Sequence, residues 1–381
     1  MRILHFYKAY YTDSVGGVEQ AIRQMCVGTA RHGVVNEVLT LTAGKHTGEL
    51  EFEGHRVHRL PRSIEIASNG MSFAAFGELA RRAAQCDVVH YHFPWPFADL
   101  AHFVARVGKP CVVTYHSDIV RQKFLLRLYR PLMHRFLCSV DAIVATSPNY
   151  MASSAVLSGY RDKTRVITYG LDRSLYPPPR ANRMQYWRSR AGKRFFLFVG
   201  VLRYYKGLHI LLEAMAGKPF PVVIVGAGPI EAALRAHAAR LGLRNVLFAG
   251  AVDDEDKMAL LESCYGVVFP SHLRSEAFGM SLLEGAMLGK PLISSEIGTG
   301  TSYINADGDT GLVVPPGDPV ALSAAMHYLW DNPERAAAMG RRAAERYHAL
   351  FTAQRMAASY TSLYHELAAR QAPVRLVHAN L

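Results

Sequence analysis

Residues 266–289 read GVVFPSHLRSEAFGMSLLEGAMLG, a short apolar run followed by a loop and a helix-like segment. The run Gly266–Phe269 predicts a buried strand, and residues 280–288 predict a helix that ends before a glycine. Backbone N–H groups at a helix start have no intrahelical partner, and such free donors favour a phosphate. Four residues lie at this predicted start: Phe278, Gly279, Met280 and Ser281.

Two carboxylates flank the helix start. Glu276 lies in the loop before the helix, and Glu284 follows about two turns (~8 residues) later. One carboxylate can therefore accept hydrogen bonds from sugar hydroxyls while the other accepts them from ribose hydroxyls. The alternative is a pair of solvated glutamates beside an ordinary helix start.

The pattern Glu, seven residues, Glu, with Phe-Gly after the first acid, resembles the hallmark of the retaining glycosyltransferases of family 4. The resemblance covers nearly the whole chain, and the segments that carry it stand in the family's order. These segments are Val15–Glu19, Val113–Ser117, Lys206-Gly207 and Thr310–Asp318. The resemblance implies the GT-B fold, a nucleotide-sugar donor, no metal and no cofactor.

Short apolar runs alternate with helical patterns along the chain, which is typical of α/β domains with buried parallel sheets. The clearest break is Pro177-Pro178-Pro179-Arg180 and the polar stretch after it. We therefore expect two doubly wound, Rossmann-like domains, which the resemblance places face to face across a cleft. The expected ranges are 1–176 for the acceptor-binding domain, 177–193 for the linker, 194–352 for the nucleotide-sugar-binding domain, and 353–381 for a helix crossing back to the first domain and a tail.

In such sheets ligands bind beyond the carboxyl ends of the strands. Gly16 and Gly17 follow the first predicted strand and precede a helix, so they offer close backbone approach to a ligand; a plain turn has the same sequence. His116 follows the strand Cys111–Tyr115. It can bind a sugar hydroxyl, or it can be a histidine satisfied by nearby protein groups. The resemblance favours a catalytic role for His116 and a donor-binding role for the glycines.

Arg203 and Lys206 supply two cations after the strand Phe195–Val199, where they suit a diphosphate whose charge grows as it leaves. An ordinary solvated pair is the alternative. The family commonly has an arginine directly after the strand glycine, where this chain has Val201. Lys206 matches the family's register, and Arg203 supplies a guanidinium two residues after the family's position.

Gly226 and Gly228 lie in a Gly-x-Gly-Pro loop that the family shares and that we expect to bind the donor. The loop also resembles a dinucleotide fingerprint, which leaves an NAD(P)- or flavin-dependent oxidoreductase as an alternative function. That function needs an acidic residue about 20 positions later, where Asn245 and Val246 stand. A catalytically silent sugar-nucleotide-binding protein is the second alternative.

The segment Gly298–Asn305 replaces the Gly-Gly-x-x-Glu that is common in the family. With this departure the chain most resembles O-antigen mannosyl- and rhamnosyltransferases. That resemblance implies transfer of mannose or D-rhamnose from a GDP-sugar to a lipid-linked acceptor of the N-acetylglucosaminyl-diphosphoundecaprenol type.

Residues 121–137 set basic side chains at helical spacing against leucines, a pattern typical of helices that lie on anionic membranes. The residues at this spacing are Lys123, Arg127, Arg130 and His134, and we expect the first three to contact the membrane. An ordinary surface helix is the alternative, with Pro131 bending it. A cytoplasmic enzyme with a lipid-linked acceptor needs such a surface, so we expect a peripheral protein on the inner face of the cytoplasmic membrane.

The formal net charge is +12, which indicates anionic partners. Nucleic acid is disfavoured because the sequence has no zinc-finger spacing, RNP-like aromatic motif or long basic tail. The chain also has no run of about 18 apolar residues that would span a membrane, and no secretory leader pattern at its start.

Overall fold

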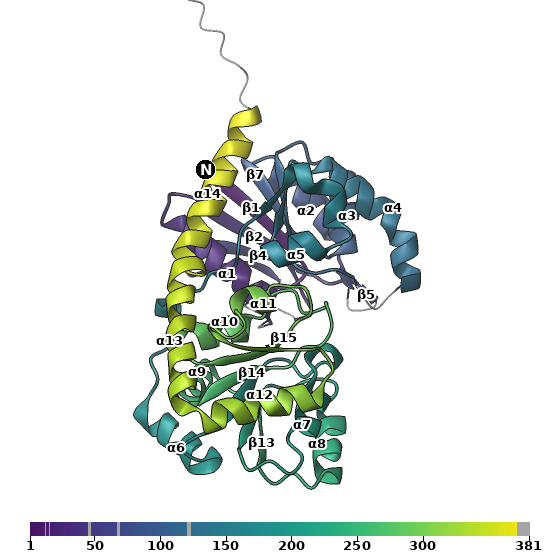
Figure 1. Ribbon diagram of the computed structural model, residues 1–381. Coiled ribbons are helices and arrows are strands. Elements are labelled where there is room, and N and C mark those ends of the chain that lie inside the picture. The colour runs from purple at the N-terminus through teal and green to yellow at the C-terminus, as the bar shows by residue number, and fades with distance from the viewer. Residues whose placement is uncertain (12, 15, 45–46, 67–68, 120–122, 372–381) are drawn as a thin grey trace, which may run out of the picture.

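The computed structural model describes residues 1–371 except 12, 15, 45–46, 67–68 and 120–122, and it consists of two domains stacked one above the other (Figure 1). Each domain is built on a parallel sheet with helices on both faces, which confirms the predicted α/β class.

The N-terminal sheet has the strand order β10-β9-β8-β7-β1-β2-β4-β3, and only β3 runs antiparallel to its neighbour. Its strands are β1 (Arg2–Tyr7), β2 (Val35–Thr42), β3 (Gly48–Phe52), β4 (His55–Pro61), β7 (Val88–Phe93), β8 (Cys111–Tyr115), β9 (Ala142–Ala145) and β10 (Thr164–Val166), beside a small hairpin of β5 (Ile64–Ile66) and β6 (Asn69–Met71). Its helices are α1 (Gly17–Ala30), α2 (Ala74–Ala83), α3 (Pro96–Val104), α4 (Lys123–Ser139), α5 (Pro148–Ser153), and the 3₁₀ helices η1 (Leu157–Lys163) and η2 (Arg173–Leu175).

The C-terminal sheet has the order β13-β12-β11-β14-β15-β16, and all its pairs are parallel. Its strands are β11 (Phe196–Val199), β12 (Val222–Val225), β13 (Val246–Gly250), β14 (Gly266–Phe269), β15 (Leu292–Ser295) and β16 (Gly311–Val314). The remaining helices are α6 (Ala181–Ala191), η3 (Tyr204–Lys206), α7 (Leu208–Ala214), α8 (Glu231–Arg240), α9 (Asp254–Ser263), α10 (Met280–Met287), α11 (Thr301–Ile304), α12 (Pro319–Asp331), α13 (Pro333–Leu350) and α14 (Ala353–Gln371).

The strand order reverses at the first strand of each sheet. β1 lies between β2 and β7, and β11 lies between β12 and β14. The crevice outside the carboxyl ends of strands at such a reversal is where open α/β sheets bind ligands. The sequence-predicted site residues after β1, β8, β11 and β14 lie at these two edges.

The last helix joins the domains. The buried residues of α14 recur at helical spacing, so one stripe of the helix faces inward; they include Met356, Tyr360, Leu363, Tyr364 and Leu367. This stripe packs on α1, and α14 lies along the N-terminal domain while α13, which precedes it, lies along the C-terminal domain (Figure 1). Its residues belong to one hydrophobic cluster that also contains Ile3 of β1 and Leu283 of α10.

The range predicted as a linker contains a helix. α6 packs on α9, where Trp187 is buried and donates its Nε1–H to Asp256 at 2.9 Å. Arg183 also pairs with Asp256 at 2.7 Å. The sequence pattern hides this helix because only Trp187 and Ala191 of α6 are buried, too few to give an apolar stripe.

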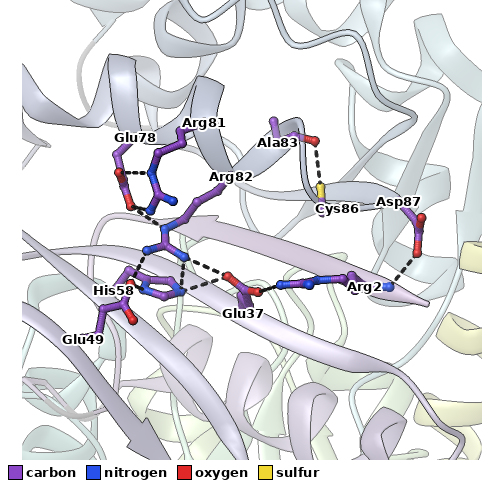
Figure 2. Close-up of polar contacts among 10 residues, drawn as sticks. All are labelled: Arg2, Glu37, Glu49, His58, Glu78, Arg81, Arg82, Ala83, Cys86 and Asp87. Atoms are coloured by element: carbon purple, nitrogen blue, oxygen red, sulfur yellow. Dashed lines mark hydrogen bonds and ion pairs between the residues drawn. The ribbon is translucent and has the colours of Figure 1, made fainter.

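A buried arginine ties α2 to the edge of the N-terminal sheet (Figure 2). The Arg82 guanidinium donates to Glu37 of β2 at 2.9 Å, to Glu49 of β3 at 2.5 Å and to Glu78 of α2 at 2.5 Å. His58 of β4 also contacts Arg82, at 2.6 Å. Arg82 is thus the shared partner of three carboxylates, of which Glu37 also pairs with Arg2 and Glu78 with Arg81.

We expect Arg82→Met to lower the free energy of unfolding by about 3–5 kcal/mol, because removing one partner of a buried ionic network leaves uncompensated charge. Arg81→Met is the matched control, since Arg81 is the adjacent arginine and is exposed, with Glu78 as its carboxylate partner. Urea unfolding of both variants measures the difference. Equal stability of the two would show that the network contributes nothing beyond surface ion pairs.

Candidate active site

The central feature of the candidate site is a buried ion pair between Lys206 and Glu276. Glu276 lies in the loop after β14 and is 8% exposed, and its Oε2 accepts from Lys206 Nζ and, at 3.2 Å, from the Ser271 hydroxyl. Lys206 ends η3 after β11, with Nζ 4.8 Å from the centre of the Phe269 ring. The two sequence-predicted residues therefore meet at the junction of β11 and β14.

Gly207 makes this meeting possible. Its backbone is left-handed with φ of 69°, and a Cβ there would lie 1.9 Å from the Pro270 carbonyl oxygen. Only glycine fits so close an approach at that φ. The Lys206-Gly207 pair in the sequence thus has a structural reason: the glycine lets the loop press against the end of β14.

The start of α10 faces the start of α1 from the other domain. Gly279 is the left-handed N-cap of α10 with φ of 101°, and the Ser281 hydroxyl donates to the Val199 carbonyl at 2.8 Å. A Cβ on Gly17 would lie 3.2 Å from Cγ of Met280. The structure therefore brings Gly17, Gly279, Met280 and Ser281 together, and Ser281 anchors the α10 start to the end of β11.

Gly16 caps α1 and already has an anionic neighbour. A Cβ on Gly16 would lie 2.5 Å from Glu19 Oε2, and Ser14 donates its hydroxyl proton to Glu19 Oε1 at 2.9 Å. A carboxylate in the first turn is favourable at a helix N-terminus. An incoming phosphate at this point would therefore meet the Glu19 carboxylate.

Phe278 is buried beneath the loop that carries Glu276. Its ring packs edge-on against Tyr169 with ring centres 4.8 Å apart, and a Cβ on Gly300 would lie 2.5 Å from its Cδ2. The Gly300 N–H donates to the Ala277 carbonyl at 2.8 Å. Phe278 thus supports the loop from below.

Glu284 is 3% exposed and its Oε1 accepts three hydrogen bonds. The donors are the Tyr176 hydroxyl at 3.1 Å, Gln20 Nε2 at 3.4 Å and Lys257 Nζ at 3.2 Å. Burial opposes the charge of Lys257, but the Glu284 and Asp254 carboxylates together raise its pKa. The sequence analysis named none of these three donors. Lys257 could have been found, because it lies near the start of α9, which follows β13 at the same edge of the C-terminal sheet.

Gly226 and Gly228 serve backbone packing. A Cβ on Gly226 would lie 2.0 Å from the Gly200 carbonyl oxygen, and one on Gly228 would lie 2.4 Å from the Leu202 carbonyl oxygen. The Leu202 N–H donates to the Ala227 carbonyl at 3.0 Å. These glycines therefore hold the loop that leads to the exposed Arg203, and contact with the donor stays a prediction for them.

His116 has protein partners on both ring nitrogens. Its Nε2 contacts His92 Nδ1 at 2.9 Å, and its Nδ1 contacts the Tyr169 hydroxyl. Burial lowers the pKa of His116 to about 3, so the ring is neutral at neutral pH. His116 thus has the nearby protein partners that the sequence analysis gave as the alternative to sugar binding. A direct hydrogen bond from His116 to a sugar requires one of these partners to move.

Comparison with known proteins identifies the family. A model described as "Glycosyltransferase Family 4" matches residues 15–175, and one described as "Glycosyl transferases group 1" matches residues 180–346. The D-rhamnosyltransferase WbpZ of Pseudomonas aeruginosa is 62% identical over 353 residues, which are 93% of each chain. The chain belongs to the family 4 glycosyltransferases.

Two further comparisons agree with this. The O-antigen chain mannosyltransferase C of Escherichia coli is 51% identical over 364 residues, 96% of this chain and 98% of that one. The sucrose-phosphate synthase of Thermosynechococcus elongatus superposes with a TM-score of 0.81 at 22% identity, covering 97% of this chain and 99% of that one. The fold is therefore GT-B, and the protein is a glycosyltransferase enzyme.

Lys8 is a further cation of the glycosyltransferase that sequence reasoning missed. It follows β1, and its Nζ lies 5.9 Å from the centre of the Tyr7 ring. Burial lowers the pKa of Lys8, the Glu19 carboxylate raises it, and the Arg203 guanidinium of the other domain lowers it further. Lys8 and Arg203 thus bring positive charge to the site from both domains. Its position directly after β1 could have indicated a role in the site, because ligands bind beyond the carboxyl ends of such strands.

One group of potential metal ligands occurs among the described residues. Single ring nitrogens of His5, His90 and His92 lie within 4.8 Å of one another. All three rings are buried in the N-terminal domain, and each nitrogen already has a hydrogen-bond partner. We therefore assign no metal to this group.

The predicted membrane helix is α4. Arg127 and Arg130 are exposed on it, as are Leu125 at 47% and Leu128 at 68%. The side chain of Lys123 lies outside the described residues. α3 packs on α4 and itself exposes Leu100 and Val104. Among the described helices, none is both long and apolar enough to cross a membrane.

We expect both Lys206→Ala and Arg203→Ala to slow sugar transfer, with Lys206→Ala the more damaging. Lys206 is held in the buried pair with Glu276, whereas Arg203 is exposed. One lost charge-assisted hydrogen bond costs about 1.5–3 kcal/mol, or roughly ten- to hundredfold in kcat/KM. Steady-state transfer assays measure the order. A larger loss for Arg203→Ala would make that arginine the main ligand of the diphosphate.

Proposed function

We propose that the enzyme transfers mannose or D-rhamnose from a GDP-sugar, with retention of configuration, to a lipid-linked saccharide in O-antigen synthesis. The observation that carries the proposal is the buried Lys206–Glu276 pair at the edge where the two domains meet. The sugar and the pathway are supported by the two close relatives, which are named as a D-rhamnosyltransferase and an O-antigen chain mannosyltransferase.

The pair suits a donor that carries an anion next to a polyol. A diphosphate is attracted to the Lys206 ammonium and to the free N–H groups at the start of α10. When Lys206 turns to the diphosphate, the Glu276 carboxylate is released to accept hydrogen bonds from sugar hydroxyls. Binding of the donor therefore replaces the Lys206–Glu276 ion pair with contacts from Lys206 to the diphosphate and from Glu276 to the sugar.

Transfer breaks the bond between the anomeric carbon and the diphosphate oxygen, and the leaving diphosphate gains negative charge. Lys206 and Arg203, together with Lys8 from the other domain, compensate that charge where it develops. As in the family, we place the acceptor hydroxyl on the same face of the sugar as the leaving group. The hydroxyl oxygen forms the new bond to the anomeric carbon, and the hydroxyl proton passes to the leaving diphosphate. These cations fill the role that a metal has in other transferases.

Three cationic groups and a carboxylate aimed at a polyol do not match the needs of hydride transfer, which argues against the oxidoreductase. A catalytically silent nucleotide-sugar-binding protein would bind the donor in the same way. Release of the nucleoside diphosphate on adding acceptor distinguishes the transferase from both alternatives.

The first test is a panel of GDP-, UDP- and ADP-sugars with lipid-diphosphate acceptors, followed by mass spectrometry of the product. We expect product from GDP-mannose or GDP-D-rhamnose. Glu276→Gln should lower kcat/KM by about ten- to hundredfold, because an acceptor-only carboxylate becomes an amide that also donates. Glu345→Gln, at an exposed glutamate of α13 away from the carboxyl ends of the strands, is the control. Near-normal turnover of Glu276→Gln would remove that residue from the site.

We extend the proposal to a peripheral location on the inner face of the cytoplasmic membrane. A lipid-linked acceptor keeps its diphosphate at the membrane surface, so the enzyme has to dock there. The exposed arginines and leucines of α4 and the exposed apolar residues of α3 support this surface.

Changing Lys123, Arg127 and Arg130 to Ser should release the protein from anionic liposomes, since each basic residue near such a surface contributes about 1 kcal/mol. Binding of the unchanged protein should weaken as salt rises. The matched control changes Arg188, Arg190 and Lys193, which are exposed in and after α6 of the other domain. Co-sedimentation measures binding, and activity toward a short water-soluble acceptor should survive the triple change. Salt-independent binding, or equal loss with both acceptor types, would contradict membrane docking.

A further inference from the structure

Four histidines form a stacked layer on the face of the N-terminal sheet that α1 and α14 cover. His5 comes from β1, His90 and His92 from β7, and His116 from the end of β8, and all four are buried. The rings of His5, His92 and His116 are nearly parallel, with centres 5.4 Å and 5.1 Å apart along the series. All eight ring nitrogens of the layer have a protein partner.

The orientation of one amide sets the direction of hydrogen bonding in this layer. Asn36 of β2 donates its Nδ2 hydrogens to the Cys26 carbonyl and the Thr29 hydroxyl oxygen, both at 3.0 Å. The Thr29 hydroxyl itself donates to the Met25 carbonyl at 2.7 Å, so its oxygen accepts from Asn36. The Asn36 Oδ1 can then only accept, and His5 must donate its Nε2–H to it at 3.2 Å.

This assignment propagates through the rings, because a neutral imidazole has one donor and one acceptor nitrogen. His5 Nδ1 accepts from His92 Nε2–H at 3.1 Å, and His92 Nδ1 accepts from His116 Nε2–H at 2.9 Å. His116 Nδ1 then accepts the hydroxyl proton of Tyr169. Burial lowers the pKa of His5 to about 4 and that of His116 to about 3, so the rings are neutral at neutral pH.

The series of hydrogen bonds ends at Tyr169, which contacts the loop that carries Glu276 in the C-terminal domain. Tyr169 follows β10, and its ring meets Phe278 edge-on with centres 4.8 Å apart. Phe278 lies two residues after Glu276 and supports the loop that carries it. The Tyr169 hydroxyl is thus held from the interior of the N-terminal domain while its ring positions a residue of the C-terminal domain.

We propose that Asn36, His5 and His92 are positioning residues: they fix the tautomer of His116 and, through Tyr169, the place of Phe278 and the Glu276 loop. The predicted effect on sugar transfer rests on the proposed function, whereas the tautomer assignment does not. His90 is the internal control, because it lies in the same layer but bonds instead to Tyr364 and Thr114, both at 2.7 Å.

The first measurement reads the tautomers directly in the unchanged protein by nitrogen-15 NMR of its labelled histidines. We expect His5, His92 and His116 to carry the proton on Nε2 and to have an unprotonated Nδ1 at neutral pH. A proton on Nδ1 of His116, or a charged ring in the series, would overturn the proposal. This readout holds whether or not the sugar donor has been assigned correctly.

The second measurement compares His92→Phe with His90→Phe, since both remove one buried imidazole from the same layer. We expect His92→Phe to lower kcat by roughly tenfold or more and to let His116 populate both tautomers. His90→Phe should leave kcat within about twofold and keep the His116 tautomer, with a similar loss of thermal stability. Equal effects on kcat and on the His116 signal would reduce the layer to a structural role.

Elemental analysis of the purified protein tests the alternative that the histidine layer binds a metal ion. Stoichiometric metal that His5→Phe or His90→Phe abolishes would show a metal site in place of the hydrogen-bonded series. If transfer activity is absent from the unchanged protein while the tautomers are as expected, the proposed function fails and the tautomer assignment stands.

Discussion

The ion pair between Lys206 and Glu276 is the interaction on which the candidate site depends. Burying two opposite charges gains little stability by itself, because the cost of removing them from water offsets their attraction. This chain nevertheless holds the pair at the junction of β11 and β14. It does so with a left-handed glycine against the Pro270 carbonyl and a serine hydroxyl on the carboxylate. A pair kept at such cost suits a role in ligand exchange, since a diphosphate and a sugar together can replace each partner's contact.

Other buried polar side chains of the protein are also paired with hydrogen-bond or charge partners. Glu284 is matched by Tyr176, Gln20 and Lys257, so side chains of both domains surround this one carboxylate. α14 adds a second tie, because its tyrosines reach the N-terminal sheet through Thr114 and His90. The two domains are thus joined by polar contacts around Glu284 and along α14.

The sequence predicted the strands that are buried on both faces, because their apolar runs are continuous. Cys111–Tyr115 and Gly266–Phe269 occur in the structure with the predicted bounds. It did not predict β4, whose inward-facing residues include His55 and His58 in place of aliphatic ones, or α6, which buries only two side chains. Both elements are stabilised by polar partners far away in the chain, and periodicity contains no information about those partners.

The candidate site divides in the same way. Motif spacing indicated Glu276, Lys206 and the start of α10, because each of them lies in the segment directly after a buried strand. It did not indicate Lys257, Tyr176 or Gln20, which reach Glu284 from other elements. It also could not show that Gly226 and Gly228 are required by the neighbouring backbone, or that both nitrogens of His116 are occupied. Those facts depend on how separate loops pack.

The most direct test of the central claim is calorimetric binding of GDP to the unchanged protein, to Glu276→Gln and to Lys206→Met. If Lys206 exchanges Glu276 for the diphosphate, Glu276→Gln should bind GDP at least as tightly as the unchanged protein, because the competing carboxylate charge is gone. Lys206→Met should bind GDP more weakly. Glu276→Gln weakening GDP binding as much as Lys206→Met does would contradict the exchange and make the pair a structural contact.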